Sequence, residues 1–253
     1  MPEQPARLPA SLLARPVAHR GLHGAGRPEN SASAIRAALQ AGYGIEIDLQ
    51  LSADGVAMVF HDATLERLTE AQGPVCARRA QELSQIPLRG STEPIPTLRE
   101  VLTLVAGQAP LLIEIKDQTG TLSPGPEVLE QAVARDLAGY RGDVALMSFN
   151  PACVTALARL APDRPRGLTT CAFAPEDWPD LTAERRSALA AIPDFDTAGC
   201  SFISHDWTDL GAAPVAALAR RDIPILCWTI RSPAQEQTAR TVAQNITFEN
   251  YLP

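Results

Sequence analysis

Two pairs of residues spaced two apart could place charged side chains together inside a β-structure. Glu46 and Asp48 form the first pair, and Glu114 and Lys116 form the second. Residues two apart in a strand point to the same side. Burying three carboxylates with one lysine is unfavourable unless a cation balances them. Because Glu46, Asp48 and Glu114 offer only oxygen ligands, the pattern favours one divalent cation, Mg²⁺ or Ca²⁺, over Zn²⁺.

Two further kinds of side chain suggest what this cation would act on. With the metal bound, Arg20 and Lys116 remain as positive charge, which suits an anion with several oxygens such as a phosphate. Lys116 is also the single lysine of the chain. His19 and His61 titrate near pH 7, so one can accept a proton while the other donates it. Together these residues predict cleavage of a P–O bond in a phosphodiester.

Each of these residues also has a purely structural interpretation. Glu46 and Asp48 could pair with arginines, His19 could be structural, and Trp228 could be a core aromatic residue. The coincidence of so many ionisable residues at predicted strand ends favours the functional interpretation.

Other polar residues are not part of this predicted cluster of ionisable side chains, and they are assigned other roles. His23 is predicted to be a solvated loop residue, and His205 to be a residue that could line a pocket. Glu29-Asn30 is interpreted mainly as a helix start, and Arg78-Arg79 as part of a solvated face.

The elements that must position these residues alternate between strands and helices. Eight short, mostly apolar segments are typical of strands buried on both faces: Pro16–His19, Gly44–Leu49, Leu111–Lys116, Val144–Phe149, Gly167–Thr170, Ser201–His205, Ile225–Ile230 and Asn245–Glu249. Eight strands alternating with helices in 253 residues suggest an α/β fold, a (β/α)8 TIM barrel, which needs about 250 residues. A doubly wound open sheet would alternate in the same way.

Helix boundaries are visible between the strands. A helix over residues 30–41 should end at Gly42, and Thr97 with Glu100 forms a capping box before a helix that stops at Gly107. Ser232 with Gln235 forms a second capping box. Three prolines occupy expected first helical positions: Pro126, Pro151 (after Asn150 as N-cap) and Pro214.

A turn after the second strand predicts a small hairpin excursion. Ala53-Asp54-Gly55 separates two strand-like runs. A loop centred on Asp54 places His61 opposite Ile47, so His61 would return to the barrel mouth beside Glu46 and Asp48.

Composition excludes several classes of protein. The apolar fraction is 45% and the formal net charge is −7, so binding to nucleic acid or stable association with an anionic membrane is disfavoured. Five scattered cysteines without a C-x-x-C motif indicate reduced thiols in a cytoplasmic protein. The N-terminus carries no apolar segment of signal-peptide length, and no run approaches a membrane span. Residues 1–14 are predicted to be a short, loosely ordered lead-in, and residues 15–253 a single catalytic domain.

The order of these motifs resembles the glycerophosphodiester phosphodiesterase family over nearly the whole chain, from about Pro16 onwards. The matching pieces are His19-Arg20-Gly21, Pro28-Glu29-Asn30, Glu46-x-Asp48, Asp54-Gly55, His61-Asp62, Leu65 with Arg67 and Thr69, Pro96-Thr97-Leu98, Glu114-Ile115-Lys116, Ser148-Phe149 and Trp228-Thr229. The resemblance implies a TIM barrel that hydrolyses glycerophosphodiesters, such as glycerophosphocholine or glycerophosphoethanolamine, to glycerol 3-phosphate and an alcohol.

The resemblance also implies roles for individual residues. His19 and His61 would be the acid–base pair, and Glu46, Asp48 and Glu114 the metal ligands. Arg20 and Lys116 would hold the phosphate, while Trp228 and Phe149 would pack against the glycerol. The C-terminal end departs from the family's usual Thr-Asp-x-Pro: it reads Thr247-Phe248-Glu249-Asn250, and Glu249 could replace the usual aspartate.

Three alternatives stand beside this interpretation. Lysophospholipase D and sphingomyelinase D enzymes resemble the same motif set, but they need an apolar platform for acyl chains. A catalytically silent phosphodiester-binding protein would lack a histidine or a metal ligand, and all of these are present. A metal-dependent sugar isomerase on the same barrel would not explain Arg20 with Lys116.

Overall fold

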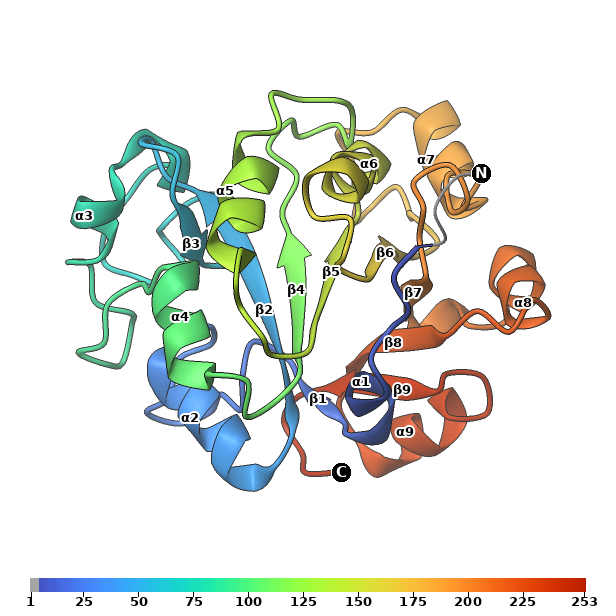
Figure 1. Ribbon diagram of the computed structural model, residues 1–253, viewed down its shortest axis with the longest axis horizontal. Helices are drawn as coiled ribbons and strands as arrows, with labels where there is room; N and C mark the ends of the chain where they lie inside the picture. The colour runs from blue at the N-terminus through green and yellow to red at the C-terminus, as the bar shows by residue number, and fades with distance from the viewer. Residues whose placement is uncertain (1–4) are drawn as a thin grey trace.

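The computed structural model describes residues 5–253, and its centre is a closed barrel of eight parallel strands (Figure 1). Neighbouring strands follow the chain order, and β1 pairs with both β2 and β9, which closes the sheet. This closure confirms the TIM barrel and excludes the open sheet. The barrel strands are β1 Val17–Ala18, β2 Gly44–Leu51, β4 Leu111–Ile115, β5 Val144–Ser148, β6 Arg166–Thr170, β7 Phe202–Asp206, β8 Ile225–Ile230 and β9 Asn245–Phe248.

Helices between the strands cover the outside of the barrel (Figure 1). They are α2 Ala32–Ala41, α4 Leu98–Val105, α5 Val128–Leu137, α6 Pro151–Leu160, α7 Ala183–Ala190, α8 Ala213–Ala219 and α9 Pro233–Ala239, with a 3₁₀ turn at Trp207–Asp209. Helix α3 Ala80–Leu83 and the 3₁₀ turn Val75–Ala77 belong to the excursion after β3, where they pack in a separate buried cluster with Met58 and Leu65. Ile45 and Ile47 on β2 belong to one buried cluster with Ile35 on α2 and Val101 on α4. Glu46 and Asp48 alternate with these two isoleucines and therefore face the barrel interior.

The expected lead-in is partly wrong. Its residues 1–4 lie outside the described part of the chain, but Ala10–Ala14 forms helix α1. Leu12 on α1 is fully buried in a cluster with Leu112 on β4. Leu112 precedes Glu114 by two residues and faces the same interior, so α1 covers the N-terminal end of the barrel. The side-chain amide of Asn245 fixes this helix by donating to the backbone carbonyls of Leu12 and Arg15.

The predicted hairpin is confirmed together with its register. Strand β3, Ala57–Val59, runs antiparallel to β2, and Leu49 faces Val59. The backbone N–H of Phe60 continues the ladder by donating to the carbonyl of Asp48 at 2.9 Å. The register returns His61 to the mouth of the barrel, as the position of Asp54 predicted.

The cap signals place most helix ends correctly. Gly42 ends α2 in the left-handed conformation, Thr97 and Glu100 form the capping box of α4, and Asn150 caps α6. Four boundaries differ from the predicted ones. Ser31 caps α2, and α4 has Ala106 as its C-cap in place of Gly107. Helix α5 begins at Val128, two residues after Pro126, and Pro214 is the second residue of α8 rather than the first.

The second capping box is only half formed. Ser232 accepts from the backbone N–H of Gln235, but the Gln235 side chain accepts from Arg231 instead of Ser232. Among residues 5–253, no helix combines the length and the apolar character needed to cross a membrane.

Candidate active site

A pocket at the C-terminal ends of the strands brings together all nine residues that the sequence places at a site. They are His19, Arg20, Glu46, Asp48, His61, Glu114, Lys116, Phe149 and Trp228. Five residues that were not predicted complete the lining: Met147, Thr169, Thr229, Arg231 and Thr247. The Thr169 hydroxyl is buried and has no hydrogen-bond partner within the described chain, so it is available to a bound molecule.

Three buried carboxylates form the floor of the pocket. Asp48 on β2 is the direct register neighbour of Glu114 on β4, and Glu46 lies two residues before Asp48. Oxygen atoms of all three lie within 4.8 Å of one another. Burial, with the charges of Asp48 and Glu114, raises the pKa of Glu46 well above its usual value. Such crowded carboxylates fit a hard divalent cation, which takes oxygen ligands and supplies the missing positive charge.

Lys116 lies against the same acidic floor. Its Nζ is 2.7 Å from Oδ1 of Asp48 and 2.6 Å from Oε1 of Glu114. Burial alone would lower the pKa of Lys116, but these two carboxylates raise it above its usual range. Burial would likewise raise the pKa of Asp48, but the charges of Lys116 and His61 hold it well below its usual range. Lys116 is therefore a cation and Asp48 an anion at neutral pH.

Arg20 is held over the floor from three directions. Its backbone N–H donates to Glu46 at 2.8 Å, its Nε lies 3.3 Å from Asp48, and its Nη1 donates to Glu29 at 2.6 Å. The residue adopts a left-handed backbone with φ 55°. Because its guanidinium stays charged, Arg20 adds a second fixed cation beside Lys116.

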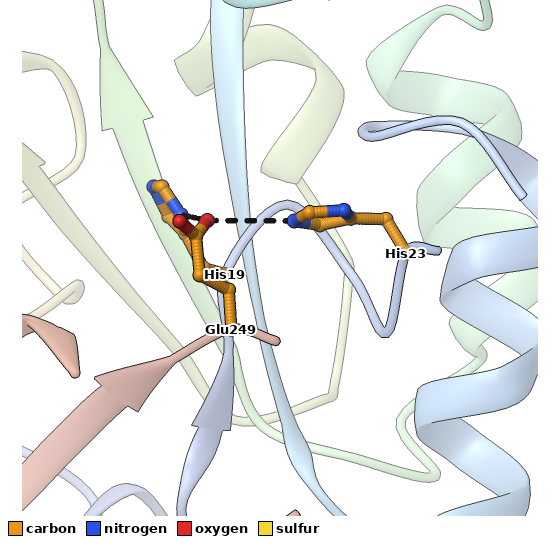
Figure 2. Close-up of side chains that lie close together, drawn as sticks. All are labelled: His19, His23 and Glu249. Carbon is orange, nitrogen blue, oxygen red and sulfur yellow. Dashed lines mark hydrogen bonds and ion pairs between the residues drawn. The ribbon is translucent and has the colours of Figure 1, made fainter. Parts of the chain in front are cut away.

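Each of the two histidines is bonded to its own carboxylate. His19 Nδ1 is 2.7 Å from Oε2 of Glu249 (Figure 2), and His61 Nδ1 is 2.7 Å from Oδ1 of Asp62. In both rings this leaves Nε2 as the nitrogen available to the pocket. Burial lowers the pKa of His19, although the bond to Glu249 opposes this shift. The arrangement can accept a proton on one ring nitrogen and donate a proton from another.

The interpretation of Glu29-Asn30 as a helix start is wrong. Asn30 is fully buried in a left-handed conformation with φ 58°, and Ser31 provides the cap. The Asn30 side chain donates to Oδ2 of Asp48 at 2.9 Å and accepts from the Asp48 backbone N–H at 3.2 Å. Asn30 therefore orients a carboxylate of the floor. The only sequence signal for this contact is its place in the Pro-Glu-Asn motif.

The prediction for His23 is also wrong. Its side chain is only 19% exposed, and Nε2 lies 3.5 Å from Oε2 of Glu249 (Figure 2). Sequence offers no signal for this contact, because it joins a loop after β1 to the end of β9. His205 is buried and bonded to Thr170 at 2.8 Å, and it is absent from the residues that line the pocket.

Aromatic side chains form one wall of the pocket. The rings of Phe149 and Trp228 meet edge to face with centroids 5.6 Å apart. Phe149 also contacts Phe173 and Trp178, which come from the segment after β6. The Trp228 indole donates to the carbonyl of Ser204 at 3.0 Å. Trp228 is thus both anchored in the wall and open to the pocket, and Phe173 and Trp178 were not anticipated.

Comparisons with known proteins point in one direction. The sequence model of the glycerophosphoryl diester phosphodiesterase family matches residues 19–246. Glycerophosphodiester phosphodiesterase of Caldanaerobacter subterraneus subsp. tengcongensis is 31% identical over 172 residues, which cover 64% of this chain and 69% of that protein. Glycerophosphodiester phosphodiesterase 1 of Bos taurus is 38% identical over 96 residues, which cover 34% of this chain and only 28% of that protein.

Solved structures share the fold. A phosphodiesterase of Oleispira antarctica, described in complex with sn-glycerol-3-phosphate, superposes with a TM-score of 0.79 at 24% identity, covering 96% of this chain and 95% of that one. A glycerophosphodiester phosphodiesterase from Agrobacterium tumefaciens gives a TM-score of 0.67 at 25% identity, covering 92% and 94%.

Proposed function

This chain belongs to the glycerophosphoryl diester phosphodiesterase family, and we propose that its pocket hydrolyses glycerophosphodiesters to glycerol 3-phosphate and an alcohol. Glycerophosphocholine and glycerophosphoethanolamine are the proposed substrates. One observation carries the proposal: two carboxylate-bonded histidines share a pocket with three buried carboxylates and two fixed cations. Such a pocket combines the groups needed to bind a phosphodiester and to move protons during its cleavage.

Glu46, Asp48 and Glu114 would hold the divalent cation, Mg²⁺ or Ca²⁺. When bound, the cation neutralises phosphate charge. The mutual crowding of these carboxylates supports this assignment.

Arg20 and Lys116 would bind the non-bridging oxygens of the phosphate. Glu29 holds the Arg20 side chain, and Asp48 with Glu114 hold the Lys116 side chain, so both cations are fixed before a substrate arrives. Fixed donors stabilise developing negative charge without reorganising during the reaction.

His19 and His61 would divide the proton transfers between them. One imidazole removes the proton from the attacking hydroxyl, which belongs either to water or to the neighbouring glycerol hydroxyl. The other imidazole gives a proton to the alcohol oxygen as its bond to phosphorus breaks. The attacking oxygen thus forms the new P–O bond, and the alcohol leaves neutral. Attack by the glycerol hydroxyl would give a cyclic phosphate that water then opens.

Residues 15–253 would act as a single catalytic domain. A cytoplasmic location is proposed as well, and the five free cysteines support it, since four of them are buried thiols and Cys76 is exposed.

Release of glycerol 3-phosphate from glycerophosphocholine and glycerophosphoethanolamine tests the proposal directly. The purified chain is assayed with Mg²⁺, with Ca²⁺ and with EDTA, and we expect release only with a metal. Glu114→Gln should abolish this release, while Glu70→Gln, a change at an 85% exposed side chain, should not. Release in EDTA at the same rate, or equal activity of Glu114→Gln, would contradict the metal-dependent mechanism.

The aromatic wall gives one alternative a specific test. Phe149 and Trp228 line the pocket as expected, and Phe173 and Trp178, which were not expected, pack against Phe149 and extend the apolar wall. Lysophosphatidylcholine therefore belongs in the same assay. Preference for it over glycerophosphocholine would assign the chain to lysophospholipase D-like activity instead.

A further inference from the structure

Behind His19, short polar contacts connect its imidazole to three side chains that have no role in the proposed reaction: Glu249, Arg231 and His23. Glu249, directly after β9, accepts from His19 Nδ1 on Oε2 and from Arg231 Nε on Oε1, both at 2.7 Å. His23 lies 3.5 Å away on the Oε2 side (Figure 2). The Glu249 side chain is 13% exposed, so its orientation is set by these contacts.

We propose that Glu249 is a positioning residue for His19, with Arg231 and His23 holding its carboxylate in place. This inference rests on the proposed acid–base role of His19. It predicts a definite tautomer: the Nδ1–H is donated to Glu249, and the lone pair of Nε2 is presented to the pocket.

The chemistry of the carboxylate fixes this tautomer. The hydrogen bond from His19 holds the pKa of Glu249 far below its usual value, so the group is ionised. An ionised carboxylate only accepts hydrogen bonds. His19 must therefore carry a proton on Nδ1 and donate it to Glu249. In a neutral imidazole this leaves Nε2 without a proton.

Glu249 is itself restrained against moving with the histidine. Its backbone N–H donates to the carbonyl of Ile230 on β8 at 2.9 Å. Arg231 follows Ile230 directly, so one strand end supplies both the backbone acceptor and the side-chain cation. The result is a rigid carboxylate on the side of the imidazole away from the substrate, the arrangement that fixes ring and tautomer in the Ser-His-Asp triad.

One ligand atom from each of His19, His23 and Glu249 lies within 4.8 Å of the other two, a spacing that could also hold a transition metal. Two features favour a hydrogen-bonded network instead. The 2.7 Å separation of His19 Nδ1 and Glu249 Oε2 is a direct charge-assisted hydrogen bond. Arg231 already neutralises the Glu249 carboxylate, which lowers its attraction for a metal cation.

The test combines steady-state kinetics with ¹⁵N NMR of the histidine rings in the full chain. Glu249→Ala should lower kcat by at least about 10-fold and should leave KM within about threefold of the wild-type value. The loss in kcat should be smaller than the loss of about 10⁴-fold that follows when the carboxylate of a Ser-His-Asp triad is replaced. Glu249→Gln keeps the length and an acceptor oxygen, so it should retain the Nδ1–H tautomer and more activity than Glu249→Ala. His23→Ala should have a smaller effect, since Arg231 still holds the carboxylate. Glu70→Gln is the matched control.

The NMR measurement separates this inference from the proposed function. In the wild-type chain His19 should show Nδ1–H and an unprotonated Nε2, and Glu249→Ala should lose this signature whether or not a glycerophosphodiester is turned over. An Nε2–H tautomer in the wild-type chain would overturn the inference. So would wild-type kcat in a folded Glu249→Ala variant, or a Co²⁺ d–d spectrum that His23→Ala removes. Absence of glycerol 3-phosphate release with an intact Nδ1–H signature would instead count against the proposed function alone.

Discussion

The guanidinium of Arg67 donates two hydrogen bonds to the carboxylate of Glu29, at 2.9 Å and 2.8 Å. The same guanidinium donates to both carboxylate oxygens of Asp62, at 2.6 Å and 2.7 Å. Asp62 is in turn hydrogen-bonded to Nδ1 of His61. Glu29 also accepts from Arg20. Arg67 therefore links the hairpin that carries His61 to the barrel loop that carries Arg20, although it does not line the pocket itself.

Replacing Arg67 with alanine should lower kcat/KM by about 10- to 100-fold, because small misplacements of reacting groups have effects of this size. The Arg67 side chain is 48% exposed, so its ion pairs should contribute about 1 kcal/mol or less to the free energy of unfolding. Kinetics and urea unfolding measure the two effects separately. Arg221→Ala, which removes a pair with Asp196 in which the two side chains are 48% and 69% exposed, is the control. A loss of activity only in proportion to a loss of folded protein would argue against a positioning role.

The fold was largely predictable because its signals are local. Apolar segments marked all eight barrel strands, and capping residues such as Thr97 and Asn150 marked helix starts. The position of Asp54 in the turn was enough to set the hairpin register. Helix α1 was missed because it is only five residues long, and its stability depends on burying Leu12 beneath the barrel rather than on a sequence pattern.

The candidate site was predictable where spacing along one strand decides the geometry. Glu46 with Asp48, and Glu114 with Lys116, could be placed on one face without knowledge of the tertiary structure. The supporting contacts could not be placed in this way. Glu29 and His23 act through partners about 38 and 226 residues away in sequence, Arg67 and Glu249. Such pairs depend on how loops meet over the barrel.

Glu46→Gln should make the metal-free protein more stable while removing its response to metal. Three buried carboxylates repel one another, and removing one charge relieves this repulsion. We expect the Tm in EDTA to rise by about 2–4 °C, the shift that about 1 kcal/mol produces in a chain of this size. Mg²⁺ or Ca²⁺ should raise the Tm of the wild-type chain but not that of the variant. An equal metal-induced rise in both would place the metal elsewhere.

Lys116→Met should lower kcat/KM by about 10²-fold or more, since one fixed cation that stabilises the phosphate is lost. Lys116→Arg should restore little, because the planar guanidinium cannot replace the compact ammonium between Asp48 and Glu114. Steady-state kinetics with glycerophosphocholine measure both variants. Near-normal turnover of Lys116→Met would exclude this lysine from phosphate binding.

Asp62 should make the stability of the folded chain depend on pH. Burial alone would raise its pKa, but hydrogen bonds from His61 and Arg67 lower it below its usual range. A carboxyl with a lowered folded-state pKa stabilises the protein above its unfolded pKa of about 3.9, and this contribution disappears as the pH falls towards the folded value. Asp62→Asn should therefore be less stable than the wild-type chain at pH 7, by about 1 kcal/mol or less.

Urea unfolding at pH 7 and at pH 3 measures this difference. The gap between the wild-type chain and Asp62→Asn should narrow at pH 3, whereas Asp163→Asn, at a 74% exposed side chain, should show no such gap. A gap that widens on acidification would have the wrong sign for a lowered pKa.

His19→Ala and His61→Ala should each reduce turnover of glycerophosphocholine by about 10²- to 10⁴-fold, the usual contribution of a general acid or base. A diester with a p-nitrophenol leaving group distinguishes their roles, because this alcohol departs without needing a proton. The variant that lacks the general acid should recover most of its activity on this substrate, and the variant that lacks the general base should not. The double variant should lose less than the product of the two single losses, since the histidines act in one reaction. Recovery of both variants, or of neither, would show that the two imidazoles do not divide the proton transfers as proposed.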